Sequence, residues 1–166
     1  MSIPSEQSGF TLIEMLAVTI VIGVVAAIAS PRLIGSWRRH QVNVALRELN
    51  GAVKETQRQA IRQGRICRIN INTANNQLTG NPTSCLLSDR KIDNNINIRT
   101  NLSGTPPNIS FSYRGSTTKS GTIVVSADSI NNQRCFVISL GIGITRTGNY
   151  TGTSTGSVSA SNCESN

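Results

Sequence analysis

The chain has 166 residues and a mass of 17.8 kDa, which is the size of one ordinary domain. Lys and Arg number 16, Asp and Glu number 8, and one histidine is present, so the formal net charge is +8. With so few and scattered acidic residues, the composition argues against a histidine-based catalytic triad, a histidine-rich metal site or a clustered carboxylate site. We therefore expect no enzyme, no cofactor and no metal.

An apolar segment lies near the N-terminus. From Met15 to Pro31 no residue is charged, and most are Val, Ile, Ala or Leu. A run of this length can span a bilayer; the alternatives are a secretory signal peptide and a buried core helix. A signal peptide begins with basic residues, but residues 1–9 contain no Lys or Arg. A core helix of this polarity needs a larger surrounding protein, so the segment predicts a retained membrane anchor.

The start of this segment carries the most specific signal in the chain, Ser8-Gly9-Phe10-Thr11-Leu12-Ile13-Glu14-Met15-Leu16. It resembles the class III prepilin signal, which type IV pilins share with the pseudopilins of type II secretion. In that family a membrane peptidase cuts after the glycine and methylates the new N-terminal phenylalanine. The resemblance implies a leader peptide at 1–9, cleavage between Gly9 and Phe10, and N-methylation of Phe10. Because glycine lacks a side chain, a peptidase can approach the backbone there closely.

The same resemblance makes Glu14 the family's glutamate, which acts in filament assembly. A carboxylate at the centre of a bilayer helix costs about 2.5–3.5 kcal/mol, so it requires a partner. The nearest basic residue along the chain, Arg32, is distant, whereas the amine made by cleavage is close, on the same chain or on a neighbouring subunit. A charge pair between subunits would favour assembly and set its register. The alternative is that Glu14 lies among the lipid headgroups.

Helical periodicity continues beyond the apolar segment. From residue 42 apolar residues recur at 42, 45, 46, 49, 52, 53 and 60, which is the spacing of one buried stripe. Gly64 is a helix stop. These patterns predict one long helix, about 10–63. Residues 10–34 form its transmembrane and filament-core part, and 35–64 form an amphipathic part that packs on a sheet.

The rest of the chain predicts strands separated by turns. Apolar and polar residues alternate over 67–72, 109–113 and 136–144, and 122–126 is a β-branched run. The segment 136–144 has the longest alternation and is the clearest predicted strand. After Arg146 the chain is rich in Thr, Gly, Ser and Asn, which predicts a loose tail from about 147.

A helix followed by strands indicates an α+β fold. The resemblance implies the pilin arrangement, in which a long N-terminal spine helix packs on an antiparallel β-sheet. The globular, β-rich head is then expected over 65–166.

The four cysteines are Cys67, Cys85, Cys135 and Cys163. They form no CxxC pair and have no accompanying histidines, which argues against zinc. An even number beyond an anchor indicates two disulfides in an oxidising compartment; three pairings are possible, and reduced thiols are the alternative. Pilins often close a loop near the C-terminus with a disulfide. The resemblance therefore favours Cys67–Cys85 with Cys135–Cys163.

Basic residues concentrate on the second half of the predicted helix. A stripe at helical spacing consists of Arg47, Lys54, Arg58 and Arg62. The sequence allows three environments for this stripe: acidic groups on neighbouring subunits, solvent, or phosphate. For the arginines that directly follow the predicted span, such as Arg38 and Arg39, lipid headgroups are the simplest partners.

A later segment narrows the resemblance. Residues 135–141, Cys-Phe-Val-Ile-Ser-Leu-Gly, resemble the C-terminal strand of the H-type pseudopilins and FimT-like minor pilins. Some FimT-like proteins bind DNA through a Gly-Arg-x-Arg motif. This chain has Gly-Ile-Gly-Ile at 141–144, so both arginines are missing, and only Arg146 lies just beyond. An anion or DNA contact would thus use Arg146 with the basic stripe.

These features predict a minor pilin or pseudopilin subunit. A prepilin peptidase and N-methyltransferase would process it, and inner-membrane machinery would assemble it with other subunits into a type IV pilus or type II secretion pseudopilus. The alternative is a DNA-binding minor pilin that acts in DNA uptake during natural transformation. Before assembly we expect a single-pass protein in a bacterial inner membrane. The resemblance and the cysteines place its head outside the cytoplasm, although the positive-inside rule alone would place it inside.

Overall fold

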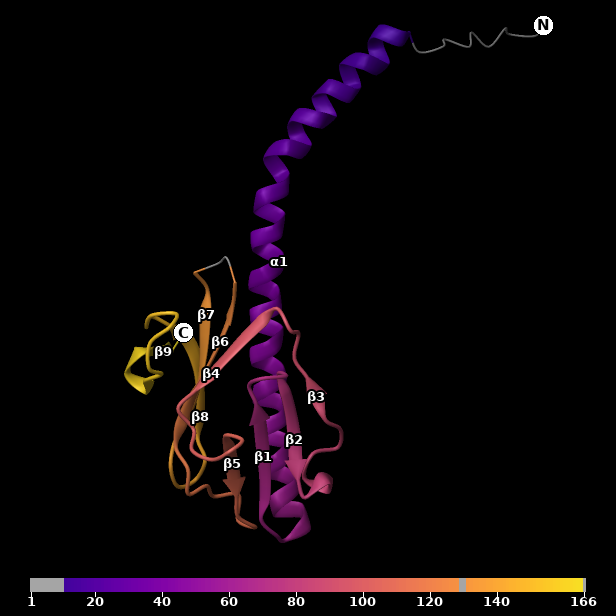
Figure 1. Ribbon diagram of the computed structural model, residues 1–166. Coiled ribbons are helices and arrows are strands. Elements are labelled where there is room, and N and C mark those ends of the chain that lie inside the picture. Colours follow the sequence, from indigo (N-terminus) through magenta and orange to yellow (C-terminus); the bar gives the residue numbers. More distant parts are fainter. Residues whose placement is uncertain (1–10, 129–130, 166) are drawn as a thin grey trace, which may run out of the picture. The chain divides into compact units, whose positions relative to one another are not determined.

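A computed structural model describes residues 11–128 and 131–165, with the side chains of 29–33 left undescribed (Figure 1). The expected leader peptide at 1–9, together with Gly9 and Phe10, lies outside the described residues. The chain divides into two compact units, residues 1–37 and residues 38–166, and each is considered by itself.

Helix α1 covers Leu12–Gln63 and contributes to both units. Its C-terminus is closed by Gly64, whose φ of 64° lies in the left-handed region that glycine adopts without strain. The N–H of Gly64 donates to the Ile61 carbonyl at 3.3 Å, and the N–H of Arg65 donates to the Ala60 carbonyl at 3.2 Å. This pair of bonds is a Schellman motif, which satisfies carbonyls that a helix end leaves free. The predicted helix end is confirmed.

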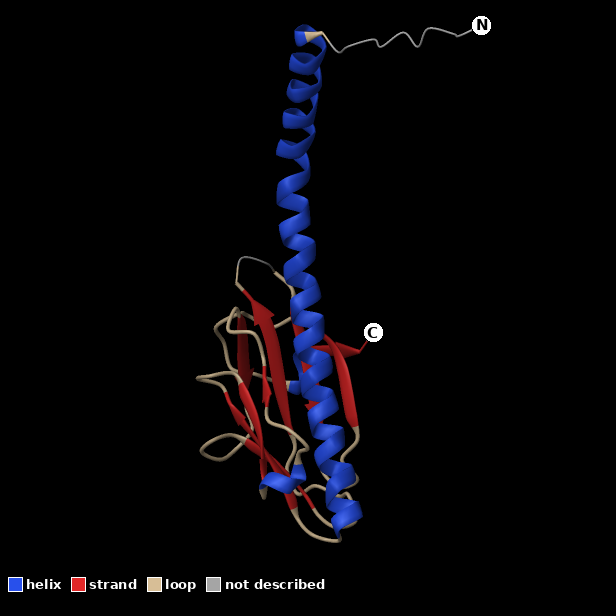
Figure 2. Ribbon diagram, turned by 90° about the vertical axis from the view of Figure 1, so that its right-hand side faces the viewer, coloured by secondary structure: helices blue, strands red, loops and turns tan. Residues whose placement is uncertain are grey.

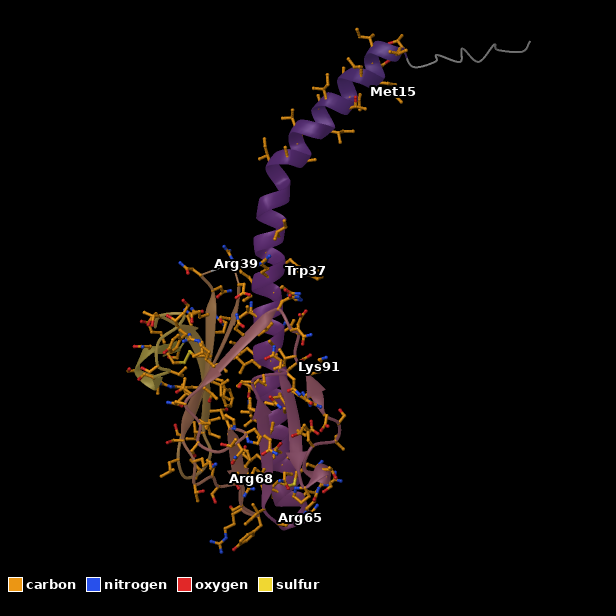
Figure 3. All side chains as sticks on the ribbon, in the orientation of Figure 1. Met15, Trp37, Arg39, Arg65, Arg68 and Lys91 are labelled. Carbon is orange, nitrogen blue, oxygen red and sulfur yellow. A yellow bond between two sulfur atoms is a disulfide. The ribbon has the colours of Figure 1, made fainter. Side chains whose placement is uncertain are left out.

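In the first unit the large apolar side chains of α1 are uncovered. The exposed fraction is 86% for Leu12, 58% for Met15 and 65% for Trp37 (Figure 3). Within the part of the chain that is described, no helix combines the length and the apolar character of a membrane span.

In the second unit α1 buries one face against strands (Figure 2). Every residue of the predicted apolar stripe is buried there: Val42, Ala45, Leu46, Leu49, Ala52, Val53 and Ala60. The helical spacing therefore placed this face correctly. The opposite face of the helix stays in solvent and carries the basic residues.

One sheet has the order β3-β2-β1-β5, with neighbouring strands antiparallel. Its strands are β1 (Cys67–Asn72), β2 (Gln77–Asn81), β3 (Arg90–Lys91) and β5 (Asn108–Phe111). Ile69 and Ile71 of β1, with Ile109 and Phe111 of β5, are fully buried in the core beneath α1. A short 3-10 helix, Thr83–Cys85, follows β2.

The other sheet has the order β4-β6-β7-β8-β9 and is also antiparallel. Its strands are β4 (Ile96–Thr100), β6 (Gly121–Ala127), β7 (Gln133–Ile138), β8 (Thr145–Tyr150) and β9 (Cys163–Ser165), the last preceded by a 3-10 helix at Ala160–Asn162. This sheet is covered on both sides. Phe136 and Ile138 of β7 join the core with α1, whereas Cys135 and Val137 join a second cluster with Tyr150. The fold is α+β, with the long N-terminal helix packed on antiparallel sheets.

The predicted strand over 136–144 is wrong beyond Ile138. Gly141 and Gly143 have φ values of 89° and 68°, so the chain turns here and returns as β8. The exposed fraction is 73% for Ile142, which confirms that the apolar side chains of the turn face away from the core. Apolar residues alternate over 136–144 as in a strand, but Gly141 and Gly143 occupy two of the intervening positions and reverse the chain.

The predicted loose tail from about 147 is also wrong in part. Residues up to Tyr150 belong to β8, and Cys163 begins β9, which pairs with β8. The hydroxyl of Tyr150 donates to the Ser157 carbonyl at 3.3 Å and accepts from the Ser159 N–H at 3.2 Å. The side chains of Tyr150, Arg99 and Asn101, together with one disulfide, hold this polar stretch, and a prediction from composition takes no account of such contacts.

Candidate functional site

The prepilin-like signal continues directly into the first turn of α1. The Glu14 N–H donates to Oγ1 of Thr11 at 3.3 Å and to the Thr11 carbonyl at 3.1 Å. Thr11 is therefore the helix N-cap, and Glu14 occupies the third helical position. Thr-x-x-Glu is the sequence signature of a capping box, a helix-start signal that is readable from the sequence alone. A carboxylate in this turn is favoured by the helix dipole.

Glu14 is exposed, and no ion pair to it exists among the described residues. Its expected partner, the amine of Phe10, lies in the part of the chain that is not described, as does the Gly9–Phe10 bond. The roles of Gly9, Phe10 and Glu14 therefore stay predictions.

The basic stripe lies on the exposed face of α1 in the second unit. Arg47, Lys54, Arg58 and Arg62 are all exposed, and none of them forms an ion pair with a described residue. Glu55 does not neutralise the stripe, because its carboxylate accepts from Nη2 of Arg90 at 2.5 Å and from the Leu87 N–H at 2.7 Å. The helix therefore presents a row of unpaired cations.

Arg146 does not join this stripe. It pairs with Val137 in the β7–β8 ladder, and its Nη2 donates to the Ala160 carbonyl at 2.9 Å. Its neighbour Thr147 pairs with Phe136, which faces α1. Successive residues of a strand point to opposite faces, so Arg146 lies on the side of the C-terminal segment, away from the helix. The expected five-residue anion surface is thus divided between two faces.

Arg134, and not Arg146, is the β-sheet arginine that lies beside the basic residues of α1. It lies two residues before Phe136 on β7 and therefore on the face toward α1. Arg134 and Thr147 line a pocket of about 390 Å³ together with Arg47, Asn50, Asn43 and Leu46 of α1. The basic stripe and the motif comparison do not single out Arg134; the signal in the sequence is a charged residue on the core-facing register of a strand.

The turn at 139–144 contains residues 141–144, which the sequence comparison above set against the Gly-Arg-x-Arg motif. Its backbone is held by two bridging hydrogen bonds between Thr117 and Gly141, at 2.7 and 2.9 Å. Nε2 of Gln57 on α1 donates to the Gly115 carbonyl at 2.8 Å and to the Ile142 carbonyl at 3.4 Å. The turn is therefore fixed against the helix, but it presents isoleucines where the motif presents arginines.

One basic side chain that was expected near lipid has a protein partner. Nη1 of Arg38 donates to the Asp128 carbonyl at 2.5 Å, whereas Arg39 is exposed (Figure 3). Arg38 therefore helps to fix the start of the second unit's helical segment to the loop after β6.

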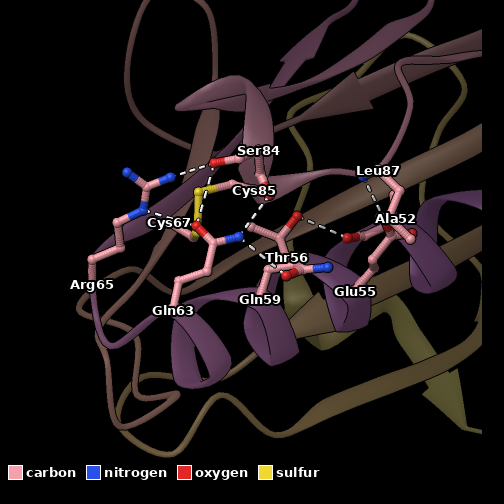
Figure 4. The surroundings of a disulfide bond; sticks show 10 residues. All are labelled: Ala52, Glu55, Thr56, Gln59, Gln63, Arg65, Cys67, Ser84, Cys85 and Leu87. Atoms are coloured by element: carbon pink, nitrogen blue, oxygen red, sulfur yellow. Dashed lines mark hydrogen bonds between the residues drawn. A yellow bond between two sulfur atoms is a disulfide. The ribbon is translucent and has the colours of Figure 1, made fainter.

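The two disulfides are Cys67–Cys85 and Cys135–Cys163, the pairing that the resemblance favoured. The first lies beside the end of α1 (Figure 4). There Nε2 of Gln63 donates to the Ser84 carbonyl at 2.8 Å, and Nε of Arg65 donates to Oε1 of Gln63 at 2.8 Å. The second disulfide joins β7 to β9 and so fixes the C-terminal segment.

Comparison with solved structures supports the pilin-like fold. The minor pseudopilin EpsH from the type 2 secretion system of Vibrio cholerae superposes with a TM-score of 0.53 at 11% identity, covering 66% of this chain and 97% of that chain. The type IV minor pilin FimU of Pseudomonas aeruginosa gives 0.53 at 14% identity, covering 67% and 89%. At these identities the likeness shows the fold alone.

Comparison with curated protein sequences gave no significant match. Two protein families do match: the prokaryotic N-terminal methylation motif over residues 4–30, and the type II transport protein GspH over residues 45–141. The second match covers more than half of the chain. The chain therefore belongs to the GspH family of type II transport proteins and carries the N-terminal methylation motif of prokaryotic prepilins.

Proposed function

We propose that this chain is a minor pilin or minor pseudopilin that is processed by a prepilin peptidase and assembled into a type IV pilus or a type II secretion pseudopilus. The observation that carries the proposal is the methylation motif at 4–30, followed by a GspH domain on the same chain. The similar structures are described as a minor pseudopilin of a type 2 secretion system and as a type IV minor pilin. We propose no catalytic activity and no cofactor.

Processing would occur between Gly9 and Phe10, and the same enzyme would methylate the new N-terminus of Phe10. Thr11 is then the second residue of the mature chain and caps its helix. Helix α1 begins at Leu12, two positions after the new N-terminus in the sequence, so Glu14 lies in the first turn of the mature chain's helix.

Before assembly, residues 10–34 would anchor the subunit in the inner membrane as a single span. The uncovered apolar side chains of the first unit support this role, because they need an apolar environment or a partner helix. In the filament the same side chains would pack against the helices of other subunits. Glu14 would then pair with the N-terminal amine of a neighbour, since an unpaired carboxylate among apolar helices is costly.

The head at 65–166 would lie outside the cytoplasm. Two disulfides support this placement, because disulfides persist in oxidising compartments such as the bacterial periplasm. On this model the basic stripe of Arg47, Lys54, Arg58 and Arg62 faces acidic groups of neighbouring subunits.

Processing is tested by replacing Gly9 in the full-length chain within its own cell. A Gly9→Val chain should accumulate with residues 1–9 attached, because a β-branched side chain obstructs access to the scissile bond. A Ser8→Ala chain, changed one residue earlier, is the matched control and should be cleaved. Intact-mass measurement distinguishes precursor from methylated product. Wild-type processing of Gly9→Val would contradict the proposal.

A DNA-binding minor pilin is the second candidate. The unpaired cations of the stripe favour it, since phosphate is a natural partner for a row of Arg and Lys. The turn at 141–144 does not support it, because it carries no arginine, and Arg146 lies on another face. We therefore place the structural role first.

A further inference from the structure

A pocket between α1 and the β7–β8 ladder is lined mainly by polar side chains. Its volume is about 390 Å³, and it is lined by Asn43, Leu46, Arg47 and Asn50 of the helix, Arg134 of β7 and Thr147 of β8. Its lining contains two guanidinium groups and no carboxylate. The pocket is therefore cationic, with two carboxamides and a hydroxyl as its other polar groups.

Arg134 is held in place from the strand side. Its Nη1 donates to Oδ1 of Asn149, the residue that pairs with it on β8. Arg47 is exposed and reaches the pocket from the helix. The pocket thus combines one fixed guanidinium with one that is free to adjust.

Two buried atoms of this pocket's residues lack a hydrogen-bond partner among the described residues. They are Nε of Arg134, which is a donor, and Oδ1 of Asn50, which is an acceptor. A buried polar group without a partner is costly. Both atoms are closed to solvent, so each side chain must turn toward the pocket to meet a ligand, and a ligand that satisfies both atoms gains from each. Such a ligand must bring an acceptor, favourably an anionic one, together with a donor.

A carboxylate side chain beside a backbone N–H meets this requirement. The carboxylate accepts from the guanidinium groups, in the geometry for which Arg is suited, and the N–H donates to Asn50. A phosphodiester has acceptors only and would leave Oδ1 of Asn50 unsatisfied. The cavity is also near the lower end of the size range of ligand pockets, so it suits a short peptide segment rather than a nucleic-acid strand.

We propose that this pocket receives an acidic side chain presented on a peptide segment of a different subunit. This inference rests on the proposed function for the identity of the partner, which is another pilin or pseudopilin. A second copy of this chain is a poor source, because each copy carries 16 Lys and Arg against 8 Asp and Glu, so two copies repel each other. Three of the eight carboxylates are also engaged within the chain. Glu55 pairs with Arg90, Asp93 accepts from Gln41 at 3.2 Å, and Asp128 accepts from Asn97 at 2.7 Å.

The test uses the mature full chain, labelled with ¹⁵N, in detergent micelles. Three probes are titrated: the peptide acetyl-Gly-Asp-Gly-amide, its uncharged counterpart acetyl-Gly-Asn-Gly-amide, and dimethyl phosphate as the phosphodiester. The readouts are the Nε–H resonance of Arg134 and the side-chain amide of Asn50. The Asp peptide should shift both resonances saturably, whereas the Asn peptide and dimethyl phosphate should not.

Variants assign the binding to the pocket. Arg134→Gln should weaken binding of the Asp peptide about tenfold, as expected for loss of one charge-assisted partner. Arg47→Gln should also weaken binding of the Asp peptide. Because Arg47 is exposed, this variant should fold even if Arg134→Gln does not, and the test then rests on it. Arg58→Gln, on the same helix but outside the pocket, is the matched control and should bind normally.

Equal shifts with dimethyl phosphate would overturn the proposal in favour of a phosphate site. Absence of any saturable shift with the Asp peptide, or an unchanged affinity in both pocket variants, would also overturn it. Filament assembly is measured separately. A chain that assembles normally but does not bind the peptide would remove this inference and leave the proposed function in place.

Discussion

Nη2 of Arg90 lies 2.5 Å from Oε2 of Glu55, and this ion pair ties β3 to helix α1. The other carboxylate oxygen of Glu55 accepts from the Leu87 N–H at 2.7 Å, so one side chain holds both β3 and the loop before it. The side chain of Glu55 is only 13% exposed. Glu55 therefore stabilises the fold and leaves the neighbouring cations of α1 without a counter-charge.

Replacing Glu55 by Ala should destabilise the protein by about 1–3 kcal/mol, because the Leu87 N–H and the Arg90 guanidinium both lose their partner. Chemical unfolding of the mature chain in detergent measures the change. Lys54→Ala, at the exposed neighbouring position, is the control and should stay within about 0.5 kcal/mol of the wild type. Equal stabilities of the two variants would show that the ion pair contributes nothing.

Removal of the Cys135–Cys163 disulfide by a double Cys→Ala change should cost about 3–4 kcal/mol, the value expected for a loop of this length. The C-terminal segment should also become sensitive to protease, since β9 adds only a short strand to the sheet. Limited proteolysis followed by mass measurement locates the cuts. Resistance of 151–165 in the double variant would mean that the β8–β9 pairing and the hydrogen bonds from Arg99, Arg146 and Tyr150 hold the segment without the disulfide.

Gly143→Ala should destabilise the protein by about 1–2 kcal/mol, because a left-handed φ is costly for any residue with a Cβ. The new Cβ would also lie 3.1 Å from Nε2 of Gln57 and 3.3 Å from Cε1 of Phe111. Gly35→Ala is the matched control, as a helical glycine with no neighbour within 4 Å of the added carbon. It should be neutral or stabilising, since Ala is the better helix former. Thermal unfolding measures the stability of both variants. A Gly143→Ala protein that is more stable than the Gly35→Ala protein would contradict the described turn.

Much of this fold follows from periodicity. The apolar stripe from Val42 to Ala60 is buried as its spacing predicts, and Gly64 ends the helix. The strand predicted at 67–72 is confirmed as β1. The prediction succeeds because buried Ile69 and Ile71 alternate with polar residues along the strand. Local patterns succeed where one face of an element is buried and the other is exposed.

The failures lie where tertiary structure overrides local pattern. Ile142 continues the apolar alternation of β7, but the glycines on both sides of it reverse the chain. The side chain of Ile142 is therefore exposed and not part of the core. Tyr150 and Cys163 are isolated in a polar stretch, so nothing local indicates that they anchor strands. Arg134 and Asn50 come together only through the packing of β7 on α1, which a single sequence does not reveal.

DNA binding by the mature chain should be weak and purely electrostatic. With four exposed cations on one face, binding should fall steeply as salt rises and should disappear near physiological ionic strength. A salt titration with a labelled duplex measures this, and a lysine-rich peptide of equal net charge is the control. Binding that persists at physiological salt, and that is lost in an Arg58→Gln/Arg62→Gln variant, would favour the DNA-uptake function instead.

The most direct test of the account follows Glu14 through processing and assembly in the cell. Sheared filaments and membranes are collected from cells that carry the wild-type chain or Glu14→Ala, with Glu14→Asp as the charge-conserving control. We predict that Glu14→Ala is cleaved to a chain beginning at Phe10, stays in the membrane, and is reduced at least tenfold in the filament fraction, since 1.4 kcal/mol already corresponds to about a tenfold change. Glu14→Ala at the wild-type level in filaments would contradict the account.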